Sequence, residues 1–216
     1  MAYKAVIFDL DGTLLDTLED LHASVTAALE ANGMPARSVD EVRAALGFGA
    51  RELIRRCVPA GTPDDAQERA YASFKRHYLA NSSAHTRPYP GIPLLVRILS
   101  QEGVQRAIVS NKPDAAVQDL AAEYFCGSFN AVAGEREGIR RKPAPDTVLS
   151  VMERLSLEPA STVYVGDSEV DIETAANAGL DCVSVSWGFR TREQLQGFGA
   201  TRIADTCEQL AEMLLL

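Results

Sequence analysis

Four aspartates stand where buried strands of this chain are expected to end. Asp9 and Asp11 follow an apolar run near the N-terminus, and Asp167 and Asp171 follow the apolar run at residues 162–166. Because the carboxyl ends of parallel strands meet at one edge of a sheet, we expect these carboxylates to converge. Converging negative charges repel one another, and a cluster of oxygen ligands suits Mg²⁺. The sequence therefore predicts an acidic magnesium site at that edge.

Hydroxyl and basic side chains are expected at the same edge. The run Ser110-Asn111-Lys112 follows another apolar segment, and Lys142 precedes a helical pattern. An ammonium group, a hydroxyl and the backbone amides of turns are suited to holding phosphate oxygens. Once a metal and Lys142 screen its negative charge, Asp9 can attack phosphorus. Asp11 can then protonate the leaving oxygen and later activate a water. The pattern predicts a site for phosphoryl transfer.

Each of these residues also has an ordinary structural explanation. A lone aspartate at the end of a strand is usually a turn residue or a helix cap. Ser110-Asn111 can cap a helix, and Lys142 can lie in a solvated loop. The helix dipole alone can favour an aspartate such as Asp171 in the first turn of a helix. Their occurrence together, in this order and at successive strand ends, favours the catalytic interpretation.

Short apolar runs alternate with helical patterns over most of the chain. Strands are expected at residues 3–9, 106–110, 129–133, 162–166 and 182–186. Strands that alternate with helices form a parallel sheet that is covered on both faces. Right-handed crossovers then place every carboxyl end at one edge. We therefore predict an α/β fold, with a Rossmann-like parallel sheet and helices on both faces.

Residues 15–87 interrupt this alternation, because they show only helical periodicity and no convincing strand. The helical patterns cover residues 14–29, 39–46, 51–58 and 64–79. We predict a small all-helical domain at residues 15–87, inserted after strand one. Residues 1–14 and 88–216 then form the α/β core.

Composition excludes several classes of protein. The chain has 216 residues, more than one small α/β domain needs and fewer than two full domains. Its net charge of −9 disfavours binding to nucleic acid or to an anionic membrane surface. No apolar run approaches the ~20 residues of a membrane span, and no signal peptide is expected. The four cysteines are widely spaced, which indicates reduced thiols and a cytoplasmic location.

The motifs resemble those of a known family. Residues 8–14, with Asp9, Asp11 and Thr13, resemble the DxDGT motif of haloacid dehalogenase (HAD) superfamily phosphatases. Ser110-Asn111 resembles the second motif of that superfamily. Lys142-Pro143 resembles the third, and Gly166-Asp167-Ser168 with Asp171 resembles the fourth. The helical insertion is similar to a cap domain placed after the first motif. The resemblance covers the whole chain, and four motifs in order are specific.

The resemblance implies roles for the four aspartates. Asp9 would be the nucleophile that forms an aspartyl-phosphate, and Asp11 the general acid and base. The Asp11 backbone carbonyl and the Asp167 carboxylate would bind the metal together with Asp9. Asp171 would support the metal site, through water or hydrogen bonds. Asp11 also favours phosphatases over the dehalogenases of the superfamily, which lack this second aspartate.

Further roles follow from the same resemblance. Ser110, the Asn111 backbone and Lys142 would hold the phosphoryl oxygens, and Thr13 would stabilise the loop after the nucleophile. Segments at residues 88–91, 110–112 and 187–190, together with the cap helices, resemble phosphoglycolate phosphatases. A Mg²⁺-dependent phosphomonoesterase acting on phosphoglycolate is therefore expected.

The cap is expected to recognise the leaving group. Gly47 lies in a Gly-rich turn that runs into a helix, and Arg51 adds positive charge beside it. These residues suit a substrate with a carboxylate, although the glycines can equally form a plain helix–helix turn with solvated arginines nearby. The expected partner is a small phosphorylated metabolite, without nucleic acid or membrane, and the chain is expected to be a monomer or homodimer.

Four alternatives remain. A phosphomutase similar to β-phosphoglucomutase shares the fold and the nucleophile, and another small phosphorylated metabolite can replace phosphoglycolate as the substrate. The turn at residues 47–50 departs from the G-x-S-R turn typical of the mutase cap, which counts against a mutase. A phospho-aspartate receiver module is disfavoured by a DxD motif on strand one. A catalytically inactive scaffold is disfavoured by the complete set of motif residues.

Overall fold

The computed structural model describes residues 3–216; Met1 and Ala2, the first residues of the predicted core, lie outside the described residues. The chain divides into two compact units. Unit 1 extends through Asp16 and resumes at Pro88, and unit 2 comprises Thr17–Arg87. Unit 2 is continuous in sequence and interrupts unit 1 after its first strand.

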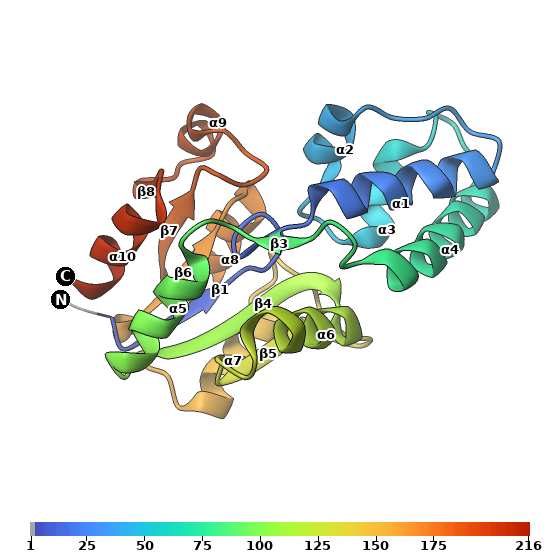
Figure 1. The fold of residues 1–216 in the computed structure, drawn as a ribbon. Helices are drawn as coiled ribbons and strands as arrows, with labels where there is room; N and C mark the ends of the chain where they lie inside the picture. Colours follow the sequence, from blue (N-terminus) through green and yellow to red (C-terminus); the bar gives the residue numbers. More distant parts are fainter. Residues whose placement is uncertain (1–2) are drawn as a thin grey trace. The chain divides into compact units, whose positions relative to one another are not determined.

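Unit 1 is built on a six-stranded sheet with the strand order β5-β4-β1-β6-β7-β8 (Figure 1). Each neighbouring pair in this sheet is parallel. The predicted α/β fold with a parallel sheet is confirmed. The strands are β1 (Ala5–Phe8), β4 (Gln105–Pro113), β5 (Ala131–Glu135), β6 (Thr162–Gly166), β7 (Asp181–Val185) and β8 (Ile203–Ala204).

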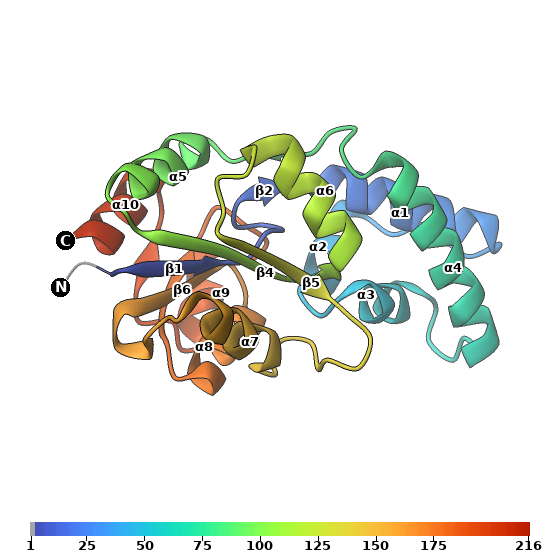
Figure 2. The ribbon, with the colours of Figure 1, turned by 90° about the horizontal axis from the view of Figure 1, so that it is seen from below.

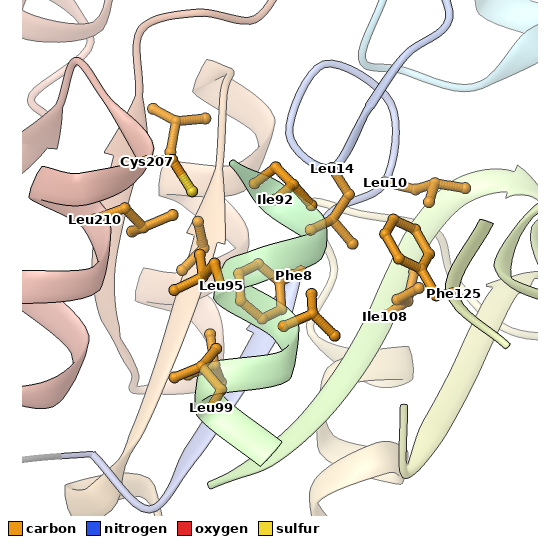
Figure 3. Close-up of a cluster of buried hydrophobic side chains, with 14 of the residues drawn as sticks. Phe8, Leu10, Leu14, Ile92, Leu95, Leu99, Ile108, Phe125, Cys207 and Leu210 are labelled. Atoms are coloured by element: carbon orange, nitrogen blue, oxygen red, sulfur yellow. The ribbon is translucent and has the colours of Figure 1, made fainter. Parts of the chain in front are cut away.

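Helices cover both faces of the sheet. Successive residues of a buried strand point to opposite faces, so both faces carry apolar side chains that must be covered. Val6 and Phe8 belong to one buried cluster, whereas Ile7 belongs to another. The first cluster lies under α5 (Ile92–Gln101), α6 (Asp114–Phe125) and α10 (Cys207–Leu215), and the second lies under α7 (Asp146–Leu155) and α8 (Glu169–Ala178) (Figure 2). Figure 3 shows side chains of α5 meeting those of β1 in the first cluster. A 3₁₀ turn (Pro159–Ser161) precedes β6, and α9 (Arg192–Gly197) precedes β8.

Because the six strands are parallel, their carboxyl ends lie at one edge of the sheet. Asp9 and Asp167 are the first residues after β1 and β6. The pairing of β4 with β5 shifts register between Val109 and Pro113, so the run Ser110-Asn111-Lys112 departs from the regular ladder. An irregularity of this kind at a strand end redirects side chains, which here places polar groups at the edge.

Several predictions about strands are wrong in detail. The strands predicted at residues 3–9, 129–133 and 182–186 are observed as β1, β5 and β7 with different bounds. β4 is longer than the predicted strand at residues 106–110, and β8 was not predicted. Residues 15–87 are not wholly free of strand, because β2 (Leu15–Asp16) pairs with β3 (Arg87–Pro88). Strands of two residues are too short to show the alternating pattern on which such a prediction depends.

Unit 2 contains four helices, as its periodicity predicts. They are α1 (Leu18–Ala31), α2 (Val39–Ala45), α3 (Ala50–Cys57) and α4 (Asp64–Asn81). Leu21, Val25 and Leu29 are buried on α1, while Phe74 and Tyr78 are buried on α4, where their rings stack with centroids 5.5 Å apart. Among residues 3–216, no helix has the length and apolar character that crossing a membrane requires.

A buried carboxylate ties the two ends of unit 2 together. Asp20, in the first turn of α1, accepts hydrogen bonds from the backbone N–H groups of His85 and Thr86 and from the Thr86 hydroxyl, at 2.8–3.0 Å. Burial raises the pKa of Asp20, but these hydrogen bonds outweigh burial and hold the pKa below its ordinary value. The ionised carboxylate therefore stabilises this junction.

We expect Asp20→Ala to lower the free energy of unfolding by about 3 kcal/mol at neutral pH, because it leaves several donors without their charged acceptor. The pKa of Asp20 is lower in the folded than in the unfolded chain. Its contribution is therefore present above the unfolded pKa of about 3.9 and is lost as the pH falls through the folded pKa. Urea unfolding followed by circular dichroism measures both effects.

The matched control is Asp65→Ala on α4. The Asp65 side chain is 71% exposed and pairs with Arg69, so its loss should cost less than about 1 kcal/mol. Equal destabilisation by the two substitutions would contradict the role assigned to Asp20.

Candidate functional site

Three aspartates form a buried acidic cluster at the carboxyl edge of the sheet in unit 1. Asp9 follows β1, Asp167 follows β6, and Asp171 lies in the first turn of α8. Each offers a carboxylate oxygen, and these oxygens lie within 4.8 Å of one another. All three residues are buried. Residues from opposite ends of the sequence thus meet in one place, and a set of oxygen donors of this kind suits a divalent cation.

Lys142 pairs with two of the three carboxylates of the cluster. Its Nζ is 3.0 Å from Asp9 Oδ1 and 2.8 Å from Asp171 Oδ1, and it donates a hydrogen bond to the Tyr164 hydroxyl at 2.9 Å. The side chain of Lys142 is only 2% exposed. A buried ammonium that contacts the Asp9 carboxylate is positioned to meet the negative oxygens of a group bound beside Asp9.

The Asn111 side chain fixes the backbone of Lys142. Its Oδ1 accepts a hydrogen bond from the Lys142 N–H at 2.9 Å, and its Nδ2 donates to the Lys142 carbonyl at 3.0 Å. The family resemblance implies for Asn111 only a backbone contact with phosphoryl oxygens. The reciprocal pair of hydrogen bonds gives the amide side chain a positioning role that the motif did not reveal.

Asp171 is held by hydrogen bonds on both of its oxygens. The Ser168 N–H and hydroxyl donate to Oδ2 at 3.2 and 2.6 Å, while Oδ1 faces Lys142 and lies 3.3 Å from the donating Tyr164 hydroxyl. Gly166 makes room for it, because a Cβ at Gly166 would lie 2.3 Å from Asp171 Cβ. These contacts orient Asp171 toward the lysine.

The loop after β1 is fastened to Asp167. The Thr13 hydroxyl donates to Asp167 Oδ1 at 3.1 Å, and the Phe189 N–H donates to Oδ2 at 2.7 Å. The indole N–H of Trp187 donates to the Thr13 carbonyl at 3.1 Å. Trp187 and Phe189 therefore support the site from the segment after β7. Thr13 links the Asp9 loop to the Asp167 loop.

Two glycines permit this close approach. Gly12 has a φ of +82°, and a Cβ there would lie 2.4 Å from Asp167 Oδ2. A Cβ at Gly188 would lie 2.3 Å from the Gly12 carbonyl oxygen and 2.5 Å from Asp167 Cβ. A side chain at either position would displace the Asp167 carboxylate. Gly12 was visible in the first motif, whereas the requirement at Gly188 follows only from the fold.

Asp11 and Ser110 lie at the same edge. The Asp11 carboxylate forms an ion pair with Lys112, with Nζ 2.7 Å from Oδ1. The Ser110 hydroxyl oxygen accepts a hydrogen bond from the Lys112 N–H at 3.2 Å. Ser110 is buried. Lys112 directly follows the second motif in the sequence, but its pairing with Asp11 emerges only from the fold.

Electrostatics indicate an excess of buried negative charge. Burial raises the pKa of Asp9 to about 7; Lys142 opposes this rise, whereas Asp171 and Asp11 add to it. Burial, Asp171 and Asp9 likewise raise the pKa of Asp167 well above its ordinary value. Burial would lower the pKa of Lys142, but Asp171 and Asp9 raise it, so this lysine carries its charge. Lys142 pairs with two of the three carboxylates of the cluster, and an added cation would stabilise the remaining buried negative charge.

Gly47 and Arg51 belong to unit 2. Gly47 has a φ of +109°, in the turn that leads to α3. The Arg51 guanidinium forms an ion pair with Glu68 and lies over the Tyr71 ring, 4.4 Å from its centroid. These contacts give Arg51 a structural role inside unit 2. Substrate contact by either residue stays a prediction.

Comparison with known proteins places these motifs in a family. A protein from Pseudomonas aeruginosa named phosphoglycolate phosphatase 1 is 34% identical over 213 residues, covering 96% of this chain and 78% of the relative. A crystal structure from Lactobacillus delbrueckii subsp. bulgaricus, provisionally assigned as a phosphoglycolate phosphatase, has a TM-score of 0.95 at 39% identity, covering 100% of this chain and 99% of that chain.

A third similar protein is CbbY from Rhodobacter sphaeroides, in a structure of a complex with xylulose-(1,5)bisphosphate. Its TM-score is 0.76 at 26% identity, with 95% of each chain covered. The family model for haloacid dehalogenase-like hydrolases matches residues 6–185. That span contains all four motifs, from Asp9 to Asp171. The predicted resemblance to HAD phosphatases is confirmed, and the chain is an enzyme that belongs to the haloacid dehalogenase-like hydrolase family.

Proposed function

We propose that this enzyme is a Mg²⁺-dependent phosphomonoester hydrolase that acts through an aspartyl-phosphate on Asp9, with phosphoglycolate as its substrate. The observation that carries the proposal is the Asp9 carboxylate, held by Lys142 in a buried cluster with Asp167 and Asp171. The substrate follows from the phosphoglycolate phosphatase names of the similar proteins.

The donor set fits magnesium. Carboxylate oxygens of Asp9 and Asp167 lie close together, and Mg²⁺ prefers oxygen ligands and keeps several waters. Asp9, Asp167 and the Asp11 backbone carbonyl would hold the ion. Asp171, with both oxygens hydrogen-bonded, would orient Lys142 and support the site. When bound, the ion reduces the repulsion between the Asp9 carboxylate and a phosphate dianion.

In the first step, an Asp9 oxygen forms a bond to phosphorus while the bond from phosphorus to the substrate alcohol breaks. Among the described residues, both polar contacts of the Asp9 side chain use Oδ1, from the Leu10 N–H at 2.7 Å and from Lys142, so Oδ2 is the oxygen that attacks. Asp11 donates a proton to the leaving oxygen. Lys142 and Ser110 bind the phosphoryl oxygens.

In the second step, a water attacks phosphorus and the bond to Asp9 breaks. Asp11, now ionised, accepts the proton of that water, which restores both carboxyl groups for the next cycle. Inorganic phosphate leaves. The two steps divide one difficult hydrolysis into two displacements at phosphorus.

Unit 2 supports the proposal as a cap domain. Its four helices lie between β2 and β3 in the sequence, after the first strand of the six-stranded sheet. Gly47 and Arg51 are the residues proposed to contact the leaving group. The four cysteines are free thiols, which supports the proposed cytoplasmic location.

Incubation with 2-phosphoglycolate and Mg²⁺ tests the proposal. We expect equal amounts of glycolate and inorganic phosphate, and we expect chelation of the metal to lower turnover at least about 100-fold, because the repulsion between two anions is then unscreened. Adding Mg²⁺ back should restore the rate. Isomerisation of a sugar phosphate without release of phosphate would contradict hydrolysis and indicate a phosphomutase.

A second substrate is favoured by one observation. CbbY, which is similar over 95% of this chain, has a structure with xylulose-(1,5)bisphosphate bound. Including this compound and other small phosphorylated metabolites in the same assay distinguishes a phosphoglycolate phosphatase from a phosphatase for a sugar phosphate. The substrate with the highest kcat/KM decides between them.

A further inference from the structure

Lys112 places a second buried ammonium beside the site. Its side chain is 4% exposed, and its Nζ is 2.7 Å from Asp11 Oδ1. The proposed steps use Lys142 for the phosphoryl oxygens but give Lys112 no task. Burying a charged lysine is costly unless it is paired, and the ion pair with Asp11 offsets that cost. The pair also holds the ammonium beside the proposed general acid, where it can meet a bound substrate.

The backbone of Lys112 is fixed by its surroundings. Its N–H donates to the Ser110 hydroxyl at 3.2 Å, within the stretch where β4 leaves its regular pairing with β5. A Cβ at Gly134 would lie 2.6 Å from the Lys112 carbonyl oxygen, so β5 packs directly against this backbone. Asp114 adds a hydrogen bond from the Gly134 N–H at 2.7 Å. A fixed backbone limits where the ammonium can reach.

We infer that Lys112 is a specificity-determining residue, whose ammonium binds a carboxylate carried by the alcohol part of the substrate. This inference rests on the proposed function, in which Asp11 donates a proton to the leaving oxygen. The leaving oxygen that receives this proton from Asp11 therefore lies near Lys112. In 2-phosphoglycolate the carboxylate carbon is two bonds from the leaving oxygen, which brings the carboxylate to the same place.

One lysine can serve both carboxylates. An ammonium has three N–H donors and can contact more than one acceptor, so the pair with Asp11 and a contact with a substrate carboxylate are compatible. A buried charged contact discriminates strongly, because a substrate without the matching group leaves the site's polar atoms less well satisfied. The substrate carboxylate keeps its charge throughout the reaction. Its contact with Lys112 should therefore act mainly on KM and less on kcat.

The experiment compares two substrates that differ at one group. These are 2-phosphoglycolate and 2-hydroxyethyl phosphate, in which a hydroxymethyl group replaces the carboxylate. We expect the wild-type enzyme to prefer 2-phosphoglycolate by at least about 100-fold in kcat/KM. Lys112→Met should lower kcat/KM for 2-phosphoglycolate about 100-fold, mostly through KM, and lower it no more than about 5-fold for 2-hydroxyethyl phosphate. Lys112→Arg should retain part of the preference.

The control is Lys4→Met, the same substitution at an exposed lysine just before β1. It should leave kcat/KM unchanged for both substrates. Equal losses on both substrates in Lys112→Met would overturn the inference and leave Lys112 as a positioning residue for Asp11. No loss on either would overturn it as well.

The wild-type enzyme separates this inference from the proposed function. Failure to release phosphate from any small phosphomonoester contradicts the proposed hydrolysis and, with it, the inference. Hydrolysis of 2-hydroxyethyl phosphate as efficiently as 2-phosphoglycolate contradicts only the inference. This comparison needs no variant, so it holds even if Lys112→Met fails to fold.

Discussion

Asp9→Asn is expected to reduce hydrolysis of 2-phosphoglycolate by a factor on the order of 10⁵ or more, because an amide cannot displace the alcohol from phosphorus. Folding should survive the substitution. The pKa of Asp9 is raised to about 7 by burial and by neighbouring carboxylates, so its charge opposes folding at higher pH. Removing that charge should leave the thermal midpoint, measured without metal, equal to or above the wild-type value.

The control for this substitution is Asp119→Asn. Asp119 is exposed on α6, and the same chemical change there should alter neither turnover nor stability. Turnover by Asp9→Asn within about 10-fold of the wild-type rate would contradict the role of Asp9 as nucleophile. Loss of activity together with loss of the folded state would show instead that the substitution acts through structure.

Asp11→Asn is expected to separate the two steps of the reaction. With 2-phosphoglycolate, which needs a proton on its leaving oxygen, kcat should fall by about 10² to 10⁴. With 4-nitrophenyl phosphate the phenolate leaves without a proton, so the first step should persist while hydrolysis of the phosphoenzyme is slow. Rapid-mixing absorbance should then show a burst of nitrophenolate equal to the enzyme concentration, followed by slow turnover.

Equal losses on both substrates, with no burst, would contradict general acid catalysis by Asp11. The wild-type enzyme provides the comparison, since it should turn over 4-nitrophenyl phosphate without a burst of that size if its second step is fast. Asparagine has nearly the same shape as aspartate. A change confined to one step is therefore attributable to the lost proton transfer.

The α/β fold was predictable because each strand is a short apolar run and each helix shows clear periodicity. The strand at residues 162–166 was predicted with the bounds of β6, and the helical patterns of unit 2 anticipate α1 to α4. β8 and the β2–β3 pair were not predictable. Each of these strands has only two residues, which is too short to show an alternating pattern. Their pairing depends on contacts with distant parts of the chain.

For the candidate site, sequence patterns singled out residues but gave few of their contacts. Asp9, Lys142 and Asp171 come from three separate motifs, and the sheet brings them within ion-pair distance. Tyr164 was missed, although a tyrosine inside an otherwise aliphatic buried strand was a signal that its hydroxyl has a polar partner. The segment at residues 187–190 was singled out, but the steric requirement at Gly188 was not predictable, because it depends on the Gly12 carbonyl, more than one hundred residues away in sequence.

Trapping the phosphoenzyme tests the central claim most directly. Asp11→Asn is mixed with 4-nitrophenyl phosphate and Mg²⁺, quenched in acid after one equivalent of nitrophenol has formed, digested and mapped by mass spectrometry. One phosphoryl group on Asp9, absent from a parallel sample of Asp9→Asn, is the predicted result. A phosphoryl group on another residue would contradict covalent catalysis through Asp9. So would an unmodified protein after a full equivalent of nitrophenol has been released.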